Sequence, residues 1–115
     1  DTEYLKWILD QGCFLGLDRY PGRLVSPHMR TVTLKKLMDM GYGERLCPSH
    51  DCICLHIHNE QADGTIAEQH DFHKSNPDQY LFMHRHVIPE LQELGATDRD
   101  IEMLFVDNPR RLFEA

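Results

Sequence analysis

The stretch CFLGLDRYPGRLVSPHMRTVTLKKLMDMGYGERLCPSHD, residues 13–51, decides the fold. It begins with a short apolar run, Cys13–Leu17, which is typical of a buried strand that opens into a polar loop. A Ser-Pro pair then starts a helix that we expect over Pro27–Met40, with Met29 as the alternative first residue. A second short strand is predicted at Arg45–Ser49. A strand, a helix and a strand in this order indicate a parallel βαβ unit.

Both expected strands run directly into polar residues. Asp18 and Arg19 follow the first strand, and His50 and Asp51 follow the second. In parallel α/β folds the chemistry lies in the loops that leave the C-terminal ends of the strands, so these four residues are the first candidates for a site. A carboxylate such as Asp51 can bind a metal through one oxygen and accept a proton through the other. The alternative is a simple loop or capping aspartate.

Apolar spacing predicts two more helices, one over residues 3–11 and one over residues 81–94. Pro89 forces either a kink or a late start in the second of these helices. His84 falls on its apolar stripe, where we expect a core or surface histidine without a catalytic role.

Capping signals mark the remaining elements. Thr97 and Asp100 have the spacing of a capping box, and Asn108 with Pro109 is expected to cap and start a terminal helical turn. Residues 52–78 form a long irregular stretch, which in a compact domain is usually functional or disordered.

The composition limits the class of protein. The 115 residues suffice for one modest domain, residues 1–115, and 41% hydrophobic with 27% charged residues argue against a disordered chain. A net charge of −7 without a dense basic cluster argues against nucleic-acid binding. No apolar run is long enough for a membrane helix, and no signal peptide is recognisable, so we expect the cytoplasm. The first residue is Asp and not Met, which indicates processing or a longer parent.

Cysteine and histidine are concentrated in CPSHDCICLHIH, residues 47–58. Thiolates and imidazoles at this density suggest zinc, yet the spacing matches no closed structural zinc pattern. Either Cys47 and Cys54 are small buried residues beside loop histidines, or one or two residues of the cluster join a metal site completed elsewhere. His70 and His73 are expected to be solvated loop residues.

Four segments carry a resemblance to a known family: GLDRYP (Gly16–Pro21), SHD (Ser49–Asp51), VIPELQELG (Val87–Gly95) and DNPRRLF (Asp107–Phe113). In this order they resemble the C-terminal part of the phosphotriesterase family, which belongs to the metal-dependent amidohydrolase superfamily. The resemblance implies the C-terminal part of a (β/α)8 TIM barrel, an α/β fold, in which the strands ending at Asp18 and Asp51 are the seventh and the eighth and strands one to six are absent. A whole barrel needs about 250 residues.

The resemblance also implies a zinc-dependent hydrolase. The family holds two divalent metals, usually zinc, with a His-x-His pair on the first strand, a carboxylated lysine, two further histidines and an aspartate at the end of strand eight, which Asp51 matches. A metal-bridging hydroxide would attack a lactone, another carboxylic ester or a phosphotriester, with Asp51 as metal ligand and proton acceptor. Arg19 resembles the substrate-facing arginine of the lactonase-like branch, and Tyr20 is expected beside it. The pair His56 and His58 follows the last strand and therefore does not match the family's His-x-His.

Three functions stay open at this point. The first is part of a hydrolase barrel, inactive alone because one carboxylate cannot hold two metals and two strands leave their edges unpaired. The second is a self-standing metal-binding protein that uses the eight histidines and four cysteines. The third is a non-catalytic interaction module. The expected partner is a small-molecule ester, with a homodimer left open and neither nucleic acid nor membrane involved.

Overall fold

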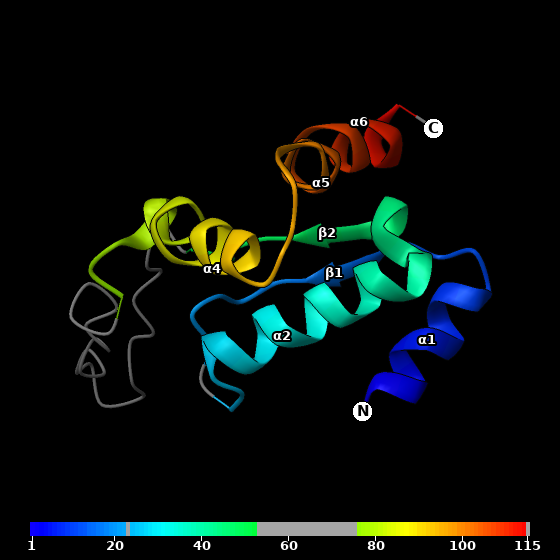
Figure 1. Cartoon of the computed structure of the whole chain (residues 1–115), viewed down its shortest axis with the longest axis horizontal. Coiled ribbons are helices and arrows are strands. Elements are labelled where there is room, and N and C mark those ends of the chain that lie inside the picture. Colours follow the sequence, from blue (N-terminus) through cyan, green and yellow to red (C-terminus); the bar gives the residue numbers. More distant parts are fainter. Residues whose placement is uncertain (23, 53–75, 115) are drawn as a thin grey trace, which may run out of the picture.

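The computed structural model describes residues 1–22, 24–52 and 76–114, which form a mixed α/β structure (Figure 1). Two parallel strands lie between α2 on one side and the α5–α6 segment on the other. The elements are α1 (Thr2–Asp10), β1 (Leu15–Leu17), α2 (Pro27–Leu37), β2 (Leu46–Pro48), α4 (Ile88–Glu93), α5 (Asp98–Glu102) and α6 (Asn108–Phe113).

The predicted βαβ unit is confirmed, because β1 and β2 pair in parallel and α2 connects them. Leu15 lies opposite Leu46 in the register. Each strand has three residues and is shorter than predicted. The two segments nevertheless stay hydrogen-bonded beyond the strands. The Ser49 N–H donates to Leu17 O (3.2 Å), and the Tyr20 N–H donates to Ser49 O (3.4 Å). These bonds keep the C-terminal ends of both strands side by side.

Helix α2 begins as its sequence predicts. The Ser26 hydroxyl accepts the N–H of Met29 at 3.3 Å, and proline occupies the first turn. The helical run continues through Met38–Tyr42, where Gly41 has φ 91°. A residue with a side chain adopts this left-handed conformation only at a cost, so glycine is suited to ending the helix here.

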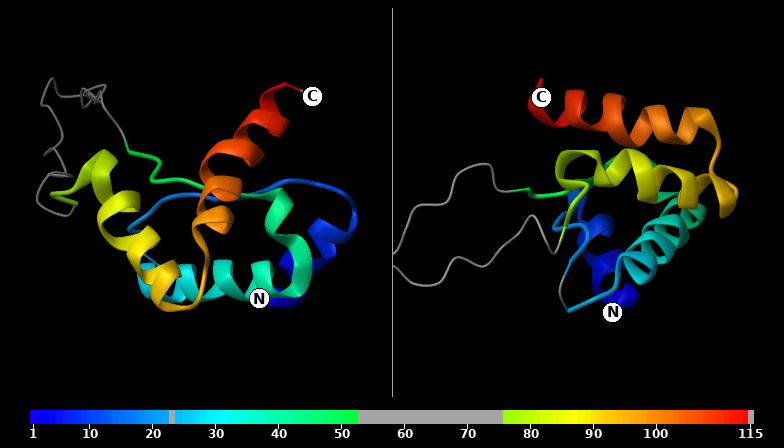
Figure 2. Two further views of the ribbon diagram at one scale, coloured as in Figure 1. Left: turned by 45° about the horizontal axis from the view of Figure 1, so that its top comes forward. Right: turned by 90° about the vertical axis from the view of Figure 1, so that its left-hand side faces the viewer.

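The hydrophobic core is formed by buried side chains of the strands, the helices and the segments between them. Figure 2 shows the arrangement of these elements from two further directions. Side chains of α1, α2, α4, α5 and both strands belong to the core or pack against it, so strands and helices depend on one another for burial. Its most buried side chains are Leu9 of α1, Leu34 and Leu37 of α2, Leu46 of β2, Leu91 of α4, Leu104 between α5 and α6, and Tyr20, Met83 and Val87.

The helix predicted over residues 81–94 forms in two parts. A wide helical turn, Met83–Val87, is followed by α4, and Pro89 lies in the first turn of α4, where a missing N–H costs least. His84 is exposed, which agrees with the surface alternative for this histidine and not with a place on the apolar stripe. Val87 and Leu91 of the expected stripe are buried, and Met83 is the buried residue one turn before Val87.

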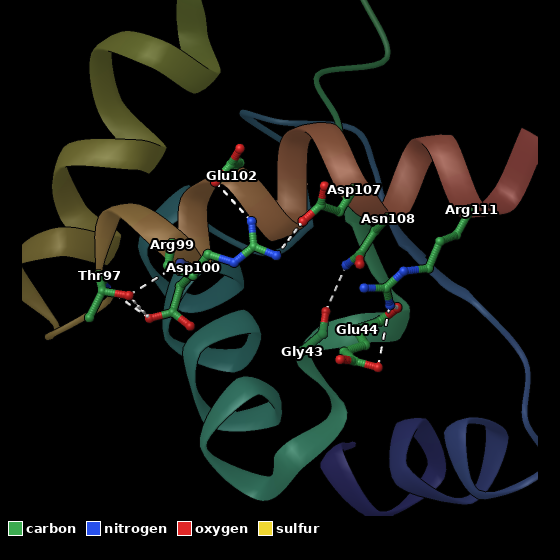
Figure 3. A network of polar contacts seen from close by, with 9 residues as sticks. All are labelled: Gly43, Glu44, Thr97, Arg99, Asp100, Glu102, Asp107, Asn108 and Arg111. Atoms are coloured by element: carbon green, nitrogen blue, oxygen red, sulfur yellow. Dashed lines mark hydrogen bonds and ion pairs between the residues drawn. The ribbon is translucent and has the colours of Figure 1, made fainter.

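The C-terminal helices carry a confirmed capping box. The Thr97 hydroxyl accepts the N–H of Asp100 (3.2 Å), and the Asp100 carboxylate accepts the N–H of Thr97 (2.8 Å), as Figure 3 shows. The bonds from Thr97 lower the pKa of the Asp100 carboxyl. This contribution to stability is therefore present above the ordinary carboxyl pKa and is lost as the pH falls through the lowered one.

The predicted capping role of Asn108 is wrong. Asn108 has helical backbone angles and lies inside one helical run that extends from α5 through α6. Its buried side-chain amide instead donates to Gly43 O (2.7 Å) and Leu46 O (2.8 Å), and the bond to Gly43 is drawn in Figure 3. Asn108 thus ties the last helix to the start of β2.

Among the helices of the described residues, none is both long enough and apolar enough to pass through a membrane.

Candidate functional site

Two of the predicted site residues meet at the C-terminal ends of the strands. Arg19 follows β1 and Asp51 follows β2, and the Arg19 Nε lies 3.6 Å from the Asp51 Oδ2. Their side chains are 75% and 58% exposed, so both groups are open to solvent and to a small molecule. An exposed ion pair at this distance contributes little to stability. The arrangement places the Arg19 guanidinium and the Asp51 carboxylate together at the strand ends.

Both residues have an unusual backbone conformation. Arg19 has φ 64° and Asp51 has φ 47°, in the left-handed region that side chains other than glycine disfavour. Such strained residues persist only where surrounding contacts hold them, and they cluster at functional sites. Among the described residues, Gln79 is the third residue other than glycine with a positive φ, and Arg19 and Asp51 are two of the four residues that the strand-end argument selected.

The turn around Asp51 is held by its neighbour on each side. The Cys52 N–H donates to the His50 Nδ1 at 2.9 Å, which closes a ring across Asp51. The rings of His50 and Tyr80 meet edge to face, with their centroids 5.1 Å apart and their planes at 84°. The imidazole is thereby fixed from two directions.

The loop that carries Arg19 is held by Arg30 of α2. Its Nη1 donates to Asp18 O at 2.7 Å and its Nε to Val25 O at 3.4 Å. Gly22 makes room for this guanidinium, because a Cβ at Gly22 would lie 2.6 Å from the Arg30 Nε. The φ of Gly22 is 80°, a conformation that also favours glycine. Arg30 could not be predicted from the sequence, because only the folded loop brings Asp18 O and Val25 O to its guanidinium.

Tyr20 has a core position. Its side chain is 1% exposed and packs near Phe82, with the ring centroids 6.4 Å apart. Burial raises the pKa of the Tyr20 hydroxyl. Tyr20 therefore anchors the loop on which Arg19 lies, and its contact with a substrate stays a prediction.

A second polar cluster lies near the start of the α4 segment, at Asp78, which sequence reasoning missed. The Asp78 carboxylate binds both His86 and Arg85 through one oxygen each. The bond from His86, followed by that from Arg85, lowers the pKa of the Asp78 carboxyl. The ring of His86 also lies 4.6 Å from that of Phe82, between centroids. The only signal in the sequence was an aspartate directly after Pro77, before a helical run.

The described residues do not assemble a metal site of their own. In residues 1–22, 24–52 and 76–114, no three side chains of His, Cys, Asp or Glu converge to hold a metal ion. Cys47 is half-buried, and burial raises the pKa of its thiol, which disfavours the thiolate that metals bind. The expectations for Cys54, His56, His58, His70 and His73 lie outside the described residues.

The carboxylate of Asp51 has the position and exposure that one ligand of a metal ion needs. Its carboxylate is more than half exposed, lies at a strand end and is separated from Arg19 by more than a hydrogen-bond distance. Oxygen ligands of this kind suit divalent cations, zinc among them. One carboxylate supplies one position, so the remaining ligands of any metal must come from outside the described residues.

The fold and the site define an α/β protein whose polar strand-end residues face one another at one end of a parallel pair. The family model for the phosphotriesterase family matches residues 1–113. The chain belongs to the phosphotriesterase family.

Curated relatives agree with this assignment. A "Phosphotriesterase homology protein" of Mycobacterium tuberculosis is 31% identical over 117 residues, which cover 99% of this chain and 33% of the relative. An aryldialkylphosphatase of Saccharolobus solfataricus is 31% identical over 115 residues, covering 98% and 35%. The chain thus spans about a third of the length of the curated relatives it matches.

Solved structures are similar as well. The phosphotriesterase from Mycobacterium tuberculosis superposes with a TM-score of 0.80 at 30% identity, covering 99% of this chain and 33% of that one. A variant of the organophosphorus hydrolase from Deinococcus radiodurans gives a TM-score of 0.80 at 25% identity, covering 98% and 34%.

Proposed function

We propose that residues 1–115 are the C-terminal part of a single (β/α)8 barrel, in which β1 and β2 are the seventh and eighth strands. The complete barrel is a metal-dependent hydrolase that acts on a lactone, another carboxylic ester or a phosphotriester. In it, Asp51 is a metal ligand and a proton acceptor, and Arg19 faces the substrate. The 115-residue chain alone is inactive.

One observation supports this proposal most: Arg19 and Asp51 meet, 3.6 Å apart, at the C-terminal ends of two parallel strands. In (β/α)8 enzymes the catalytic residues lie at that end of the barrel. The similar proteins are a phosphotriesterase, an aryldialkylphosphatase and an organophosphorus hydrolase, names that point to hydrolysis of phosphorus esters. Among the described residues each strand pairs with the other alone, which agrees with a barrel completed by further strands.

Divalent metals would supply Lewis-acid activation of the ester and of the attacking water. The two carboxylate oxygens of Asp51 allow two tasks, because one can face a metal while the other takes up a proton. The guanidinium of Arg19 is a cation that is three-quarters exposed. It would therefore attract the oxygen on which negative charge develops as the ester is attacked.

Metal removal tests the proposal directly. The longer protein should hydrolyse a lactone, an aryl ester or a phosphotriester, lose this activity on prolonged chelation, and recover it with Zn²⁺ or another divalent cation. The 115-residue chain should show no turnover under the same conditions. Initial rates before chelation, after chelation and after metal addition provide the measurement. Turnover that survives complete metal removal would contradict the proposed chemistry.

The substrate role of Arg19 is tested by Arg19→Ala in the longer protein. Loss of one charge-assisted hydrogen bond should lower kcat/KM for a lactone by about 10- to 100-fold. We expect a smaller loss for a phosphotriester, so the ratio of the two rates should change. Arg110→Ala, at an exposed arginine of α6, is the matched control and should leave both rates unchanged. An unaltered ratio in Arg19→Ala would remove Arg19 from substrate selection.

A further inference from the structure

We infer that His50 is a positioning residue for Asp51: its imidazole holds the turn that presents the carboxylate, so metal affinity depends on His50 although His50 is not a ligand. This inference rests on the ligand role proposed for Asp51. In the sequence, His50 was one of the four polar residues at the strand ends and a member of the cysteine- and histidine-rich run, and neither pattern gave it a specific role.

The first step is the geometry of the turn. The His50 Nδ1 accepts the N–H of Cys52, two residues ahead, at 2.9 Å. Asp51 lies between them with φ 47°, a conformation that an aspartate adopts only when its surroundings favour it. A side chain that accepts the N–H two residues on forms the same closed ring as an Asx turn. The His50 side chain therefore replaces a backbone turn bond and keeps Asp51 in place.

The second step is that the ring itself is fixed. Tyr80 meets the imidazole edge to face, and the His50 side chain is half-buried. Tyr80 lies in the helical turn Gln79–Leu81, which comes after residues 53–75 in the chain. The position of Asp51 is therefore coupled, through one ring contact, to the segment that leads into α4.

The third step is that these contacts leave no nitrogen of a neutral His50 free to bind a metal. A neutral imidazole has one protonated nitrogen and one lone-pair nitrogen. Because Nδ1 accepts the N–H of Cys52, the proton lies on Nε2. Only a lone pair can coordinate a metal, so His50 in this arrangement is not itself a ligand and acts through Asp51, whose ligand role is part of the proposed function. Groups that orient a metal ligand in this way commonly alter metal affinity by about 10- to 100-fold when they are mutated.

The test measures Zn²⁺ affinity in the longer protein by competition with a chromophoric chelator. His50→Ala should weaken the affinity by about 10- to 100-fold. His50→Asn should stay close to wild type, because the Asn side-chain oxygen accepts the same N–H in an Asx turn. Asp51→Asn should lose more affinity than His50→Ala. His84→Ala, at an exposed histidine of the Met83–Val87 turn, is the matched control and should change nothing.

The outcomes separate the two proposals. Wild-type affinity in His50→Ala, with affinity lost in Asp51→Asn, overturns the role of His50 alone. Equal losses in His50→Ala and His50→Asn also overturn it and identify His50 as a ligand. Wild-type affinity in Asp51→Asn overturns the ligand role of Asp51 itself. Circular dichroism spectra of all variants are compared first, and His50→Asn keeps the test decisive if His50→Ala does not fold.

Discussion

Replacing Asp51 by Asn in the longer protein is expected to lower kcat/KM for ester hydrolysis by at least about 100-fold, the scale of losing one general base. Asn has nearly the same shape, so the fold and the turn at φ 47° are retained. It carries no negative charge and only one oxygen, and it therefore binds a divalent cation weakly and cannot take up a proton. Initial rates at saturating Zn²⁺ separate the loss of the proton acceptor from simple loss of metal.

Asp39→Asn provides the matched control for this variant. Asp39 is an exposed carboxylate beyond the end of α2 that pairs with Lys35. The initial rates of ester hydrolysis by Asp39→Asn should equal those of the wild type. Turnover at the wild-type level in Asp51→Asn would exclude Asp51 from the chemistry.

The second large effect concerns stability. Asn108→Ala should lower the free energy of unfolding by about 3 kcal/mol, because it removes two buried hydrogen bonds and leaves two carbonyl oxygens without this donor. Of those carbonyls, Leu46 O belongs to the first residue of β2, and Gly43 O lies in the helical turn Gly43–Arg45 directly before it. Urea unfolding followed by circular dichroism gives the change, provided the slope of the transition is the same in both proteins.

Two further variants show whether the amide donors are responsible. Asn108→Asp keeps the size of the side chain but removes the donors, so it should destabilise at least as much as Asn108→Ala. Val106→Ala, at an exposed position of the same helical run, should stay within about 0.5 kcal/mol of the wild type. If Asn108→Ala is no more harmful than Val106→Ala, the bonds to the start of β2 do not stabilise the fold.

The sequence predicted the parts of the fold that depend on local patterns. The N-cap at Ser26, the glycine end at Gly41 and the capping box at Thr97 all follow from side-chain and backbone preferences over a few residues. The order of strand, helix and strand was sufficient for the parallel pair. It also selected Arg19 and Asp51, because position at a strand end is a local property.

The errors arose where a residue is used by a distant segment. Asn108 has the local pattern of a cap, but its amide bonds to residues more than sixty positions earlier. His84 fits an ideal helical stripe, but Met83 is the side chain that packs into the core and His84 is exposed. Arg30 looks like an ordinary helix residue until the loop folds over it. No periodicity or cap signal in the sequence encodes such contacts.

The pairing of β1 with β2 has a consequence for how this site is inherited. Arg19 and Asp51, with the groups that hold them from Asp18 to Cys52, all lie on one continuous βαβ unit. The hydrogen bonds that hold the two loops come from inside that unit, and the ring contact of Tyr80 with His50 comes from the segment that leads into α4. Recombination or segment exchange between family members would therefore transfer the cation and the carboxylate together on one piece of chain, and their alignment would also depend on the segment that carries Tyr80.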